Sequence, residues 1–405
     1  ILIWDYNIQF ANPVSPFPNL HTIGPNIKFY IRNNVRALFM QATGNKGEFA
    51  HLRAYLITKL MWNPNADPNA IIYDFLDGYY GKAAIPILNY IESMREALLN
   101  DNFRLNIFGD PRDAVKNYLA SDKMIHYNHL FDKAEKAVLD DEQKLTRVKE
   151  ARLPILIAEI QIAGQIPVGK KGSFYTIDDN GNVIPKPYMK KKVEEFVASA
   201  KKAGIQRIGE RAITIDDYAD NFKRMFTRME EMDQAISFKK KIIPISKPTF
   251  GKENLARLTD GVFGAFESWR FPDKDANWVA YKGKHMDFIL DLGAVMPIKS
   301  IEMDFLNVQA QANWHQLILP KFVTYAISPD GVKYSDPIHI YNPHNPNPAE
   351  NPDIIKLPFL TFKATYNNTK GRYLKVHAES ELQMPNWHIN AGKPAIIYAD
   401  EIVVK

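Results

Sequence analysis

Hydrophobic and polar residues alternate with a period of two in the last third of the chain. The segment Met286–Leu292 places an apolar residue at every second position, which predicts a strand with one buried face. Similar apolar runs predict further strands over Ile298–Phe305, Phe322–Ile327, Tyr373–Val376 and Ile396–Val404. The run Ser328-Pro329-Asp330-Gly331 is a hairpin signal. Short strands divided by turns predict an antiparallel β-sandwich over residues 253–405.

The front of the chain alternates strand and helix patterns. Leu2–Tyr6 predicts a strand, Pro25–Asn34 a short helix, Val35–Ala42 a second strand and Glu48–Trp62 an amphipathic helix. This β-α-β-α order is typical of parallel strands joined by crossover helices. Since a (β/α)₈ barrel needs eight such units, we expect residues 1–62 to be the last βα units of a TIM-like barrel.

Helical spacing dominates between residues 63 and 240, which predicts a mainly helical domain. Asp67-Pro68 marks a helix start, with Asp67 as N-cap and proline in the first turn. Further helices are expected over Ala83–Leu99, Ala114–Asp140, Glu142–Gly164, Met189–Ala203 and Asp216–Lys239. Trp62 and the pair Tyr79-Tyr80 have apolar neighbours at helical spacing, so we expect them in the core.

Two loop-like stretches interrupt or end the helical region. Asp178-Asp179-Asn180-Gly181-Asn182 resembles the start of a calcium loop but lacks the downstream bidentate glutamate, so a plain turn is expected. Residues 241–252 carry three lysines and two prolines, which predicts a linker in front of the sandwich.

Composition describes a soluble globular protein. The chain has 405 residues, 46% of them hydrophobic and 24% charged, which favours two or three domains. A net charge of +5 without a basic stripe among aromatics argues against nucleic acid as a partner. The absence of cysteine excludes disulfides and thiolate zinc sites. No apolar run reaches the roughly 18 residues of a membrane span. The chain opens at Ile1 without methionine, and we expect a targeting segment upstream of it.

A set of short motifs in the last 150 residues follows one family order. They are Leu258-Thr259-Asp260-Gly261, Trp269, Trp278-Val279-Ala280-Tyr281, Leu290-Asp291-Leu292-Gly293, Pro320, Ser328-Pro329-Asp330-Gly331, Arg372-Tyr373-Leu374-Lys375-Val376 and Asp400-Glu401-Ile402-Val403-Val404. Together they resemble the discoidin, or factor V/VIII type C, family and its bacterial carbohydrate-binding modules. The resemblance implies a galactose-binding-like jelly-roll sandwich that binds an oligosaccharide or polysaccharide.

The front carries a second set of motifs. They are Leu52-Arg53-Ala54-Tyr55-Leu56, Leu60-Met61-Trp62-Asn63-Pro64 and Phe75-Leu76-Asp77-Gly78-Tyr79-Tyr80-Gly81. Over about residues 1–160 the chain resembles the end of a bacterial, Bacteroides-type, glycoside-hydrolase-like domain of unknown function related to the α-glucuronidases. The resemblance implies an exported, periplasmic or cell-surface protein. It leaves catalysis open, because most of the active site in that family type lies on earlier strands.

Glycoside hydrolysis uses two carboxyl groups at the carboxyl ends of barrel strands. Asp5 is the one carboxylate at the two strand ends present, with Trp4 and Tyr6 as candidate stacking partners and Asn7 and Gln41 as candidate hydroxyl partners. The alternative is that Asp5 caps a loop while Trp4 packs beneath it. Glu48 could enter the same site, although a charge at a helix N-terminus explains it equally well.

The resemblance to the discoidin family implies a structural calcium ion. Asp260 and Glu401 fall where that family has an acidic residue after the first strand and another near the last strand. Calcium prefers six to eight hard oxygen ligands, and Thr259 or Asn254 could add one. The alternative is an ordinary Asp-Gly turn and an exposed glutamate.

Four tryptophans of the sandwich divide into two groups. Trp269 and Trp278 belong to the shared motifs and are expected to pack in the core. Trp314-His315 and Trp387-His388 lie in loop-like stretches with polar neighbours, which is the pattern of a sugar platform. Since these histidines lack acidic neighbours, we expect no zinc there.

Three functions remain open from the sequence. The leading one is the carbohydrate-binding C-terminal portion of an exported glycoside hydrolase that acts on a polysaccharide or glycan. The second is a non-catalytic glycan-binding or adhesion protein that uses the barrel remnant as a scaffold. The third is a purely structural role for the sandwich.

Overall fold

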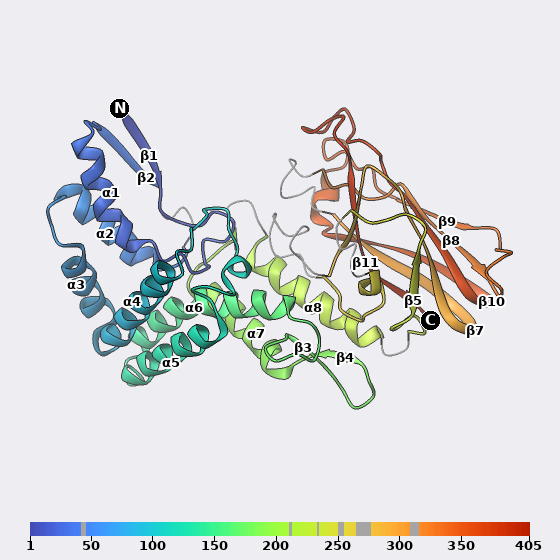
Figure 1. Cartoon of the computed structure of the whole chain (residues 1–405), viewed down its shortest axis with the longest axis horizontal. Helices are drawn as coiled ribbons and strands as arrows, with labels where there is room; N and C mark the ends of the chain where they lie inside the picture. Colours follow the sequence, from blue (N-terminus) through green and yellow to red (C-terminus); the bar gives the residue numbers. More distant parts are fainter. Residues whose placement is uncertain (42–45, 210–212, 233–234, 250–254, 265–276, 308–315) are drawn as a thin grey trace. The chain divides into compact units, whose positions relative to one another are not determined.

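The computed structural model describes residues 1–41, 46–209, 213–232, 235–249, 255–264, 277–307 and 316–405 (Figure 1). The chain forms two compact units. The first contains Ile1–Ile166, Lys171–Phe174 and Lys186–Ala219, and the second contains Pro167–Lys170, Tyr175–Pro185 and Asp220–Lys405. In the described parts of the chain, no helix has the length and apolar character needed to cross a membrane.

The first unit opens with the predicted β-α-β-α order, in β1 (Leu2–Tyr6), α1 (Leu20–Arg32), β2 (Ala37–Gln41) and α2 (Ala50–Trp62). The two strands are parallel, with Trp4 opposite Phe39. Helix α1 begins five residues earlier than predicted and contains Pro25 in its interior. Leu20, Ile23 and Ile27 are buried on one side of it, so the apolar face continues ahead of the proline.

Five further α-helices and two short 3₁₀ turns complete the first unit. They are α3 (Pro68–Tyr80), η1 (Gly81–Ala83), α4 (Ala84–Asn100), η2 (Pro111–Ala114), α5 (Ser121–Ala137), α6 (Glu142–Gln165) and α7 (Pro187–Lys202). Asp67 caps α3 as predicted, since its Oδ1 accepts the Asn69 N–H at 3.0 Å. Buried residues of α1 to α6 share one core, so the helices on both sides of residue 62 pack together. Helix α8 (Ile215–Glu231) continues into the second unit.

Two predictions for the first unit are wrong. Trp62 is 91% exposed, because it lies two residues beyond the buried Leu60 and therefore on the opposite side of α2. The expected helix Ala114–Asp140 is broken before Ser121, because Tyr118 and Leu119 turn into the core between η2 and α5. Tyr80 is buried as predicted.

The second unit contains a small hairpin and a seven-stranded sheet. The hairpin joins β3 (Tyr175–Ile177) to β4 (Val183–Pro185). Its turn is the plain one predicted, because Asp178 Oδ1 accepts the N–H groups of Asn180 and Asn182 at 2.9 and 2.7 Å. These hydrogen bonds lower the pKa of Asp178.

The large sheet has the order β6-β11-β7-β10-β8-β9, with β5 paired to β7, and all of its pairs are antiparallel. Its strands and 3₁₀ turns are β5 (Lys241–Pro244), η4 (Leu255–Leu258), β6 (Val279–Lys282), β7 (Met286–Leu306), β8 (Phe322–Ser328), β9 (Ile338–Tyr341), η5 (Pro352–Lys356), β10 (Phe359–Glu379) and β11 (Ile396–Val404). Residues 241–244 were predicted as linker. They form β5 instead, because Ile242 and Ile243 pair with the apolar edge of β7.

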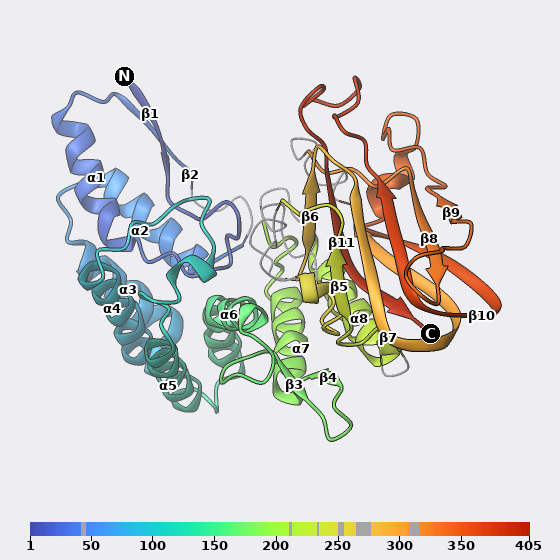
Figure 2. The same cartoon turned by 45° about the vertical axis from the view of Figure 1, so that its right-hand side comes forward.

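β7 and β10 are each 21 residues long and run side by side (Figures 1 and 2). The sequence predicted two strands in β7, separated at Pro297, but one continuous strand passes through it. The pairing with β10 shifts register between Thr365 and Thr369 and between Gly371 and Tyr373. The first half of β7 pairs with β5, and its second half pairs with β11. Bulges of this kind bend a sheet, so two layers of a sandwich share the same two strands.

The sandwich core lies between these layers. It includes Phe288 and Leu290 from the first half of β7, Ile301 and Met303 from the second half, and Val376 from β10. Trp278 is 2% exposed and stacks on the Phe359 ring at 5.7 Å, which confirms its predicted role in packing. Trp269 lies outside the described residues.

Candidate functional site

The predicted site at the ends of β1 and β2 divides between two faces. Trp4 and Tyr6 are 58% and 45% exposed, and the Trp4 ring meets Phe39 edge-on at 4.9 Å. Asp5 points to the opposite face, because side chains alternate along a strand. There it faces Tyr30 of α1, whose pKa is raised by burial and then by the charge and hydrogen bond of Asp5. The structure therefore does not place Asp5 beside the two aromatic rings.

The two predicted hydroxyl partners also separate. Trp4 Nε1 donates to Gln41 Oε1 at 2.7 Å, which holds both side chains at the exposed strand face. Asn7 is only 1% exposed, and its backbone N–H donates to the Gln41 carbonyl at 3.0 Å. Trp4, Tyr6 and Gln41 thus lie on the same exposed face of the two strands. Asn7 is buried and cannot contact a ligand from solution.

Glu48 forms a buried ion pair instead of entering a sugar site. Its Oε2 lies 2.8 Å from Arg53 Nη2, and the two side chains are 6% and 1% exposed. Burial raises the pKa of Glu48, and the Arg53 charge opposes that rise. Glu48 lines a cavity of about 240 Å³, together with residues that include His21, Phe49, Tyr90 and Arg95.

Asp260 and Glu401 lie close together as expected, and Asp400 precedes Glu401 in β11. Glu401 Oε1 accepts the Gly261 N–H, Asp260 Oδ1 accepts the Val262 N–H, and Asp400 Oδ2 accepts the Gly264 N–H, each at 2.9 Å. Glu401 and Asp400 are fully buried, so Glu401 is not the exposed residue of the alternative interpretation. The second oxygen of Asp400, Oδ1, has no hydrogen-bond partner among the described residues.

The electrostatics of this cluster favour added positive charge. Burial raises the pKa of Asp260 to about 6, although its hydrogen bonds to Glu401 and to the Val262 N–H work against the rise. Burial raises the pKa of Glu401 strongly, and the charges of Asp260 and Asp400 raise it further. A proton or a bound cation would relieve this repulsion. The carboxylate oxygens of Asp260 and Glu401 suit calcium, but two carboxylates supply only part of its usual six to eight ligands.

The loop between β10 and β11 presents Trp387. This side chain is 37% exposed, whereas His388 is 6% exposed and meets the Trp387 ring edge-on at 5.6 Å. His388 Nδ1 accepts the Asn390 N–H at 3.0 Å, so this histidine supports the loop from inside. Burial lowers the pKa of His388, which keeps the ring neutral in that role.

The loop is held in shape by its own backbone. Met384 N–H donates to Lys393 O at 2.8 Å, and Ala395 N–H donates to Leu382 O at 3.1 Å. Ile396, which ends the loop, donates its N–H to Gln316 O. The second predicted platform, Trp314-His315, lies outside the described residues.

One cluster of polar side chains on the outer face of the sheet, His285, His377 and Glu379, was not predicted from the sequence. Strand alternation turns Val376 and Ala378 into the core and His377 and Glu379 to the outer face of the sheet. In the neighbouring strands His377 lies opposite Asp287 and Thr324, and His285 reaches Glu379 from the residue before β7. The spacing His-x-Glu on a strand was the available signal, because it places both side chains on one face.

Comparison with known proteins gives a match to one protein family and matches to solved structures. Residues 1–92 match the family described as "Domain of unknown function (DUF4838)". No curated protein matches the chain.

Solved structures similar to this chain are carbohydrate-binding modules and related domains. CpGH89CBM32-6 from Clostridium perfringens is 13% identical, with 42% of this chain and 98% of that one covered and a TM-score of 0.25. The fucose binding module SpX-3 of Streptococcus pneumoniae is 14% identical, with 42% and 97% covered and a TM-score of 0.27. The C-terminal domain of a Bacteroides fragilis chitobiase is 16% identical, with 41% and 93% covered and a TM-score of 0.24. Because these TM-scores are low, we infer the function of this chain from its own residues and not from these matches.

Proposed function

We propose that the second unit binds a glycan through the loop between β10 and β11. The observation that carries the proposal is the exposed Trp387 ring on a loop whose backbone hydrogen bonds hold it in place. A sugar has an apolar C–H face that stacks on an aromatic ring. A preorganised ring loses little conformational entropy when the sugar binds.

Polar side chains on the same loop as Trp387 can meet the sugar hydroxyls. Gln383, Asn386 and Lys393 are exposed on the same loop, and amide and ammonium groups supply donors and acceptors for hydroxyls. The motifs shared with the discoidin family support the same function for this part of the chain.

The test is a glycan array probed with the full chain and with Trp387→Ala. We expect the wild-type chain to retain at least one oligosaccharide, and we expect the variant to bind it at least about tenfold more weakly, because one stacked ring contributes on the order of 1–2 kcal/mol. Trp62→Ala is the matched control, since Trp62 is 91% exposed in the first unit and its loss should leave glycan binding unchanged.

Two results would contradict the proposal. One is a wild-type chain that retains no glycan, and the other is a Trp387→Ala variant that binds as well as the wild type. Trp314→Ala extends the test to the second predicted platform.

We further propose that Asp260 and Glu401 hold a structural calcium ion. Support comes from the close approach of the Asp260 and Glu401 carboxyl groups and from the raised pKa values of both. Thr259 Oγ1 donates its proton to Lys240 O at 2.9 Å, and a hydroxyl that donates keeps its lone pairs. Asn254 lies outside the described residues. Calcium-dependent melting of the full chain tests this site.

For the front of the chain we propose the end of a TIM-like barrel of the Bacteroides-type, α-glucuronidase-related kind, in an exported glycoside hydrolase. The exposed apolar face of β1 and β2, with Leu2, Trp4, Tyr6 and Phe39, is of the kind that further strands and their side chains would enclose. Hydrolysis needs a pair of carboxylates, and Asp5 does not supply one beside Trp4. Barrel strands without a pair of acidic residues at their carboxyl ends would favour the alternative, a non-catalytic adhesion protein.

A further inference from the structure

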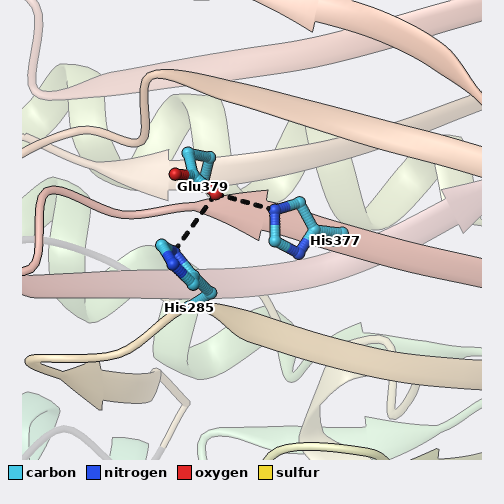
Figure 3. A group of neighbouring side chains, drawn as sticks. All are labelled: His285, His377 and Glu379. Carbon is cyan, nitrogen blue, oxygen red and sulfur yellow. Dashed lines mark hydrogen bonds and ion pairs between the residues drawn. The ribbon is translucent and has the colours of Figure 1, made fainter.

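Two histidines and one glutamate converge on the outer face of the sandwich (Figure 3). Glu379 Oε2 lies 3.0 Å from His377 Nε2 and 3.3 Å from His285 Nδ1. The three ligand atoms all lie within 4.8 Å of one another. Glu379 and His377 come from the end of β10, and His285 comes from the residue before β7.

We propose that His285, His377 and Glu379 bind a divalent transition-metal ion of the zinc type. Zinc bonds of about 2.0–2.2 Å in a tetrahedral arrangement separate neighbouring ligand atoms by roughly 3.3 Å, close to the two separations measured here. Two imidazole nitrogens and one carboxylate oxygen form a donor set that suits zinc, copper and nickel better than calcium. Such a set leaves one coordination position open.

Asp287 faces the ring nitrogen of His377 that lies away from Glu379. Its Oδ1 lies 2.8 Å from His377 Nδ1, so a proton on Nδ1 leaves the Nε2 lone pair directed at Glu379. A histidine ligand that donates its other N–H to a carboxylate is the usual arrangement around protein-bound metals. The cross-strand pair His377 and Asp287 fixes this contact through the sheet register.

The surroundings of His285 also favour a cation between the side chains. Its Nδ1 accepts the Ser380 N–H at 3.2 Å and therefore cannot at the same time donate a proton to Glu379. A lone pair of His285 Nδ1 and a lone pair of Glu379 Oε2 then face each other across 3.3 Å. A metal ion would bind to both, and it would take the Nδ1 lone pair from the long hydrogen bond to Ser380.

The site is open to solvent and separate from the proposed glycan and calcium sites. The side chains of His377, Glu379 and His285 are 26%, 28% and 33% exposed, so an ion can enter and a water molecule can fill the fourth position. Glu379 ends β10 and directly precedes the loop that carries Trp387. The metal proposal does not depend on glycan binding.

The test is a zinc titration of the full chain, without a polyhistidine tag and after removal of metals with EDTA, followed by isothermal titration calorimetry. We expect one zinc ion per chain at this site. Cobalt(II) in place of zinc should give the visible absorption bands of a four- or five-coordinate ion with nitrogen ligands. This spectrum reports on the ligands themselves and needs no enzymatic activity.

Variants locate the ion. We expect His377→Ala and Glu379→Gln to weaken zinc binding by more than about 100-fold, because each removes a ligand. Asp287→Asn should weaken it by roughly 10–100-fold, because it changes only the hydrogen-bond partner of a ligand. His339→Gln is the matched control. His339 lies on β9, which β8 separates from β10, and its ring is 5.4 Å from Phe322. Its replacement should not change zinc affinity.

The proposal is overturned if the wild-type chain binds no zinc, or if His377→Ala and Glu379→Gln bind it like the wild type. The three side chains would then form only a hydrogen-bonded ion-pair network. Melting curves of the EDTA-treated variants show whether each variant is folded. If a variant does not fold, the zinc titration and the cobalt(II) spectrum of the wild-type chain still test the proposal.

Discussion

Arg53 is the largest side chain that the first unit buries almost completely, at 1% exposure. It donates to Glu48 and to the backbone carbonyl of Phe17. A buried ion pair contributes little compared with apolar residues of the same shape, but a single buried charge without its partner is strongly destabilising. At the scale of single residues, this pair therefore decides the stability of the core next to the 240 Å³ cavity.

Arg53→Met should lower the free energy of unfolding by about 3–5 kcal/mol, because it leaves the Glu48 carboxylate buried and unpaired. Urea unfolding measures this change. The control is Lys123→Met, which breaks a half-exposed pair in which Lys123 Nζ lies 2.6 Å from Asp101 and should cost less than about 1 kcal/mol. Equal losses in the two variants would show that burial of the pair is not what matters.

At the scale of elements, two glycines occupy opposite environments. Gly371 lies where β10 shifts register against β7, and a Cβ atom there would be 2.2 Å from Ile327 Cγ2. Gly78 lies inside helix α3, and a Cβ atom there would meet no atom within 4 Å. The first glycine permits a close approach of two strands, whereas the second only weakens a helix.

Gly371→Ala should destabilise the chain by about 1–3 kcal/mol through overpacking between β10 and β8. Gly78→Ala should stabilise it by about 0.5–1 kcal/mol, because alanine is the better helix former. Urea unfolding of the two single variants gives both signs in one experiment. A neutral Gly371→Ala would mean that the two strands can move apart at the bend without loss.

At the scale of the whole molecule, the buried carboxyl groups of Asp260 and Glu401 link stability to pH. The pKa of Asp260 is about 6 in the folded protein and about 4 in an unfolded chain. The folded state therefore binds more protons between these values, and the contribution of Asp260 to the free energy of unfolding falls as the pH rises through this window. The strongly raised pKa of Glu401 extends the fall to higher pH. The shift of Asp260 corresponds to a change on the order of 3 kcal/mol.

We expect the metal-free chain to lose melting temperature between about pH 4 and pH 6. Calcium should restore it more at pH 7 than at pH 4.5, because a cation binds deprotonated carboxylates. Differential scanning fluorimetry with calcium or EDTA measures both effects. In Glu401→Gln the calcium effect should disappear, and a calcium response equal to that of the wild type would place the ion elsewhere.

Local patterns were sufficient to predict many elements of this protein. The period-two segments predicted a β-sandwich, Ser328–Gly331 marked the turn after β8, and the bounds of Ile396–Val404 agree with β11. β9 was not predicted from the sequence. Asp67 and Asp178 have the predicted roles in a helix cap and a turn. Each of these features depends on residues a few positions apart, so the sequence alone contains the information.

Contacts between distant residues were decided only by the tertiary structure. β7 continues through Pro297 because the bend against β10 lets it pair in both layers, and Asp5 turns away from Trp4 because its face of β1 packs against α1. His285 and Glu379 are 94 positions apart in the sequence. Strand register brings them together, and register follows from the packing of the whole core.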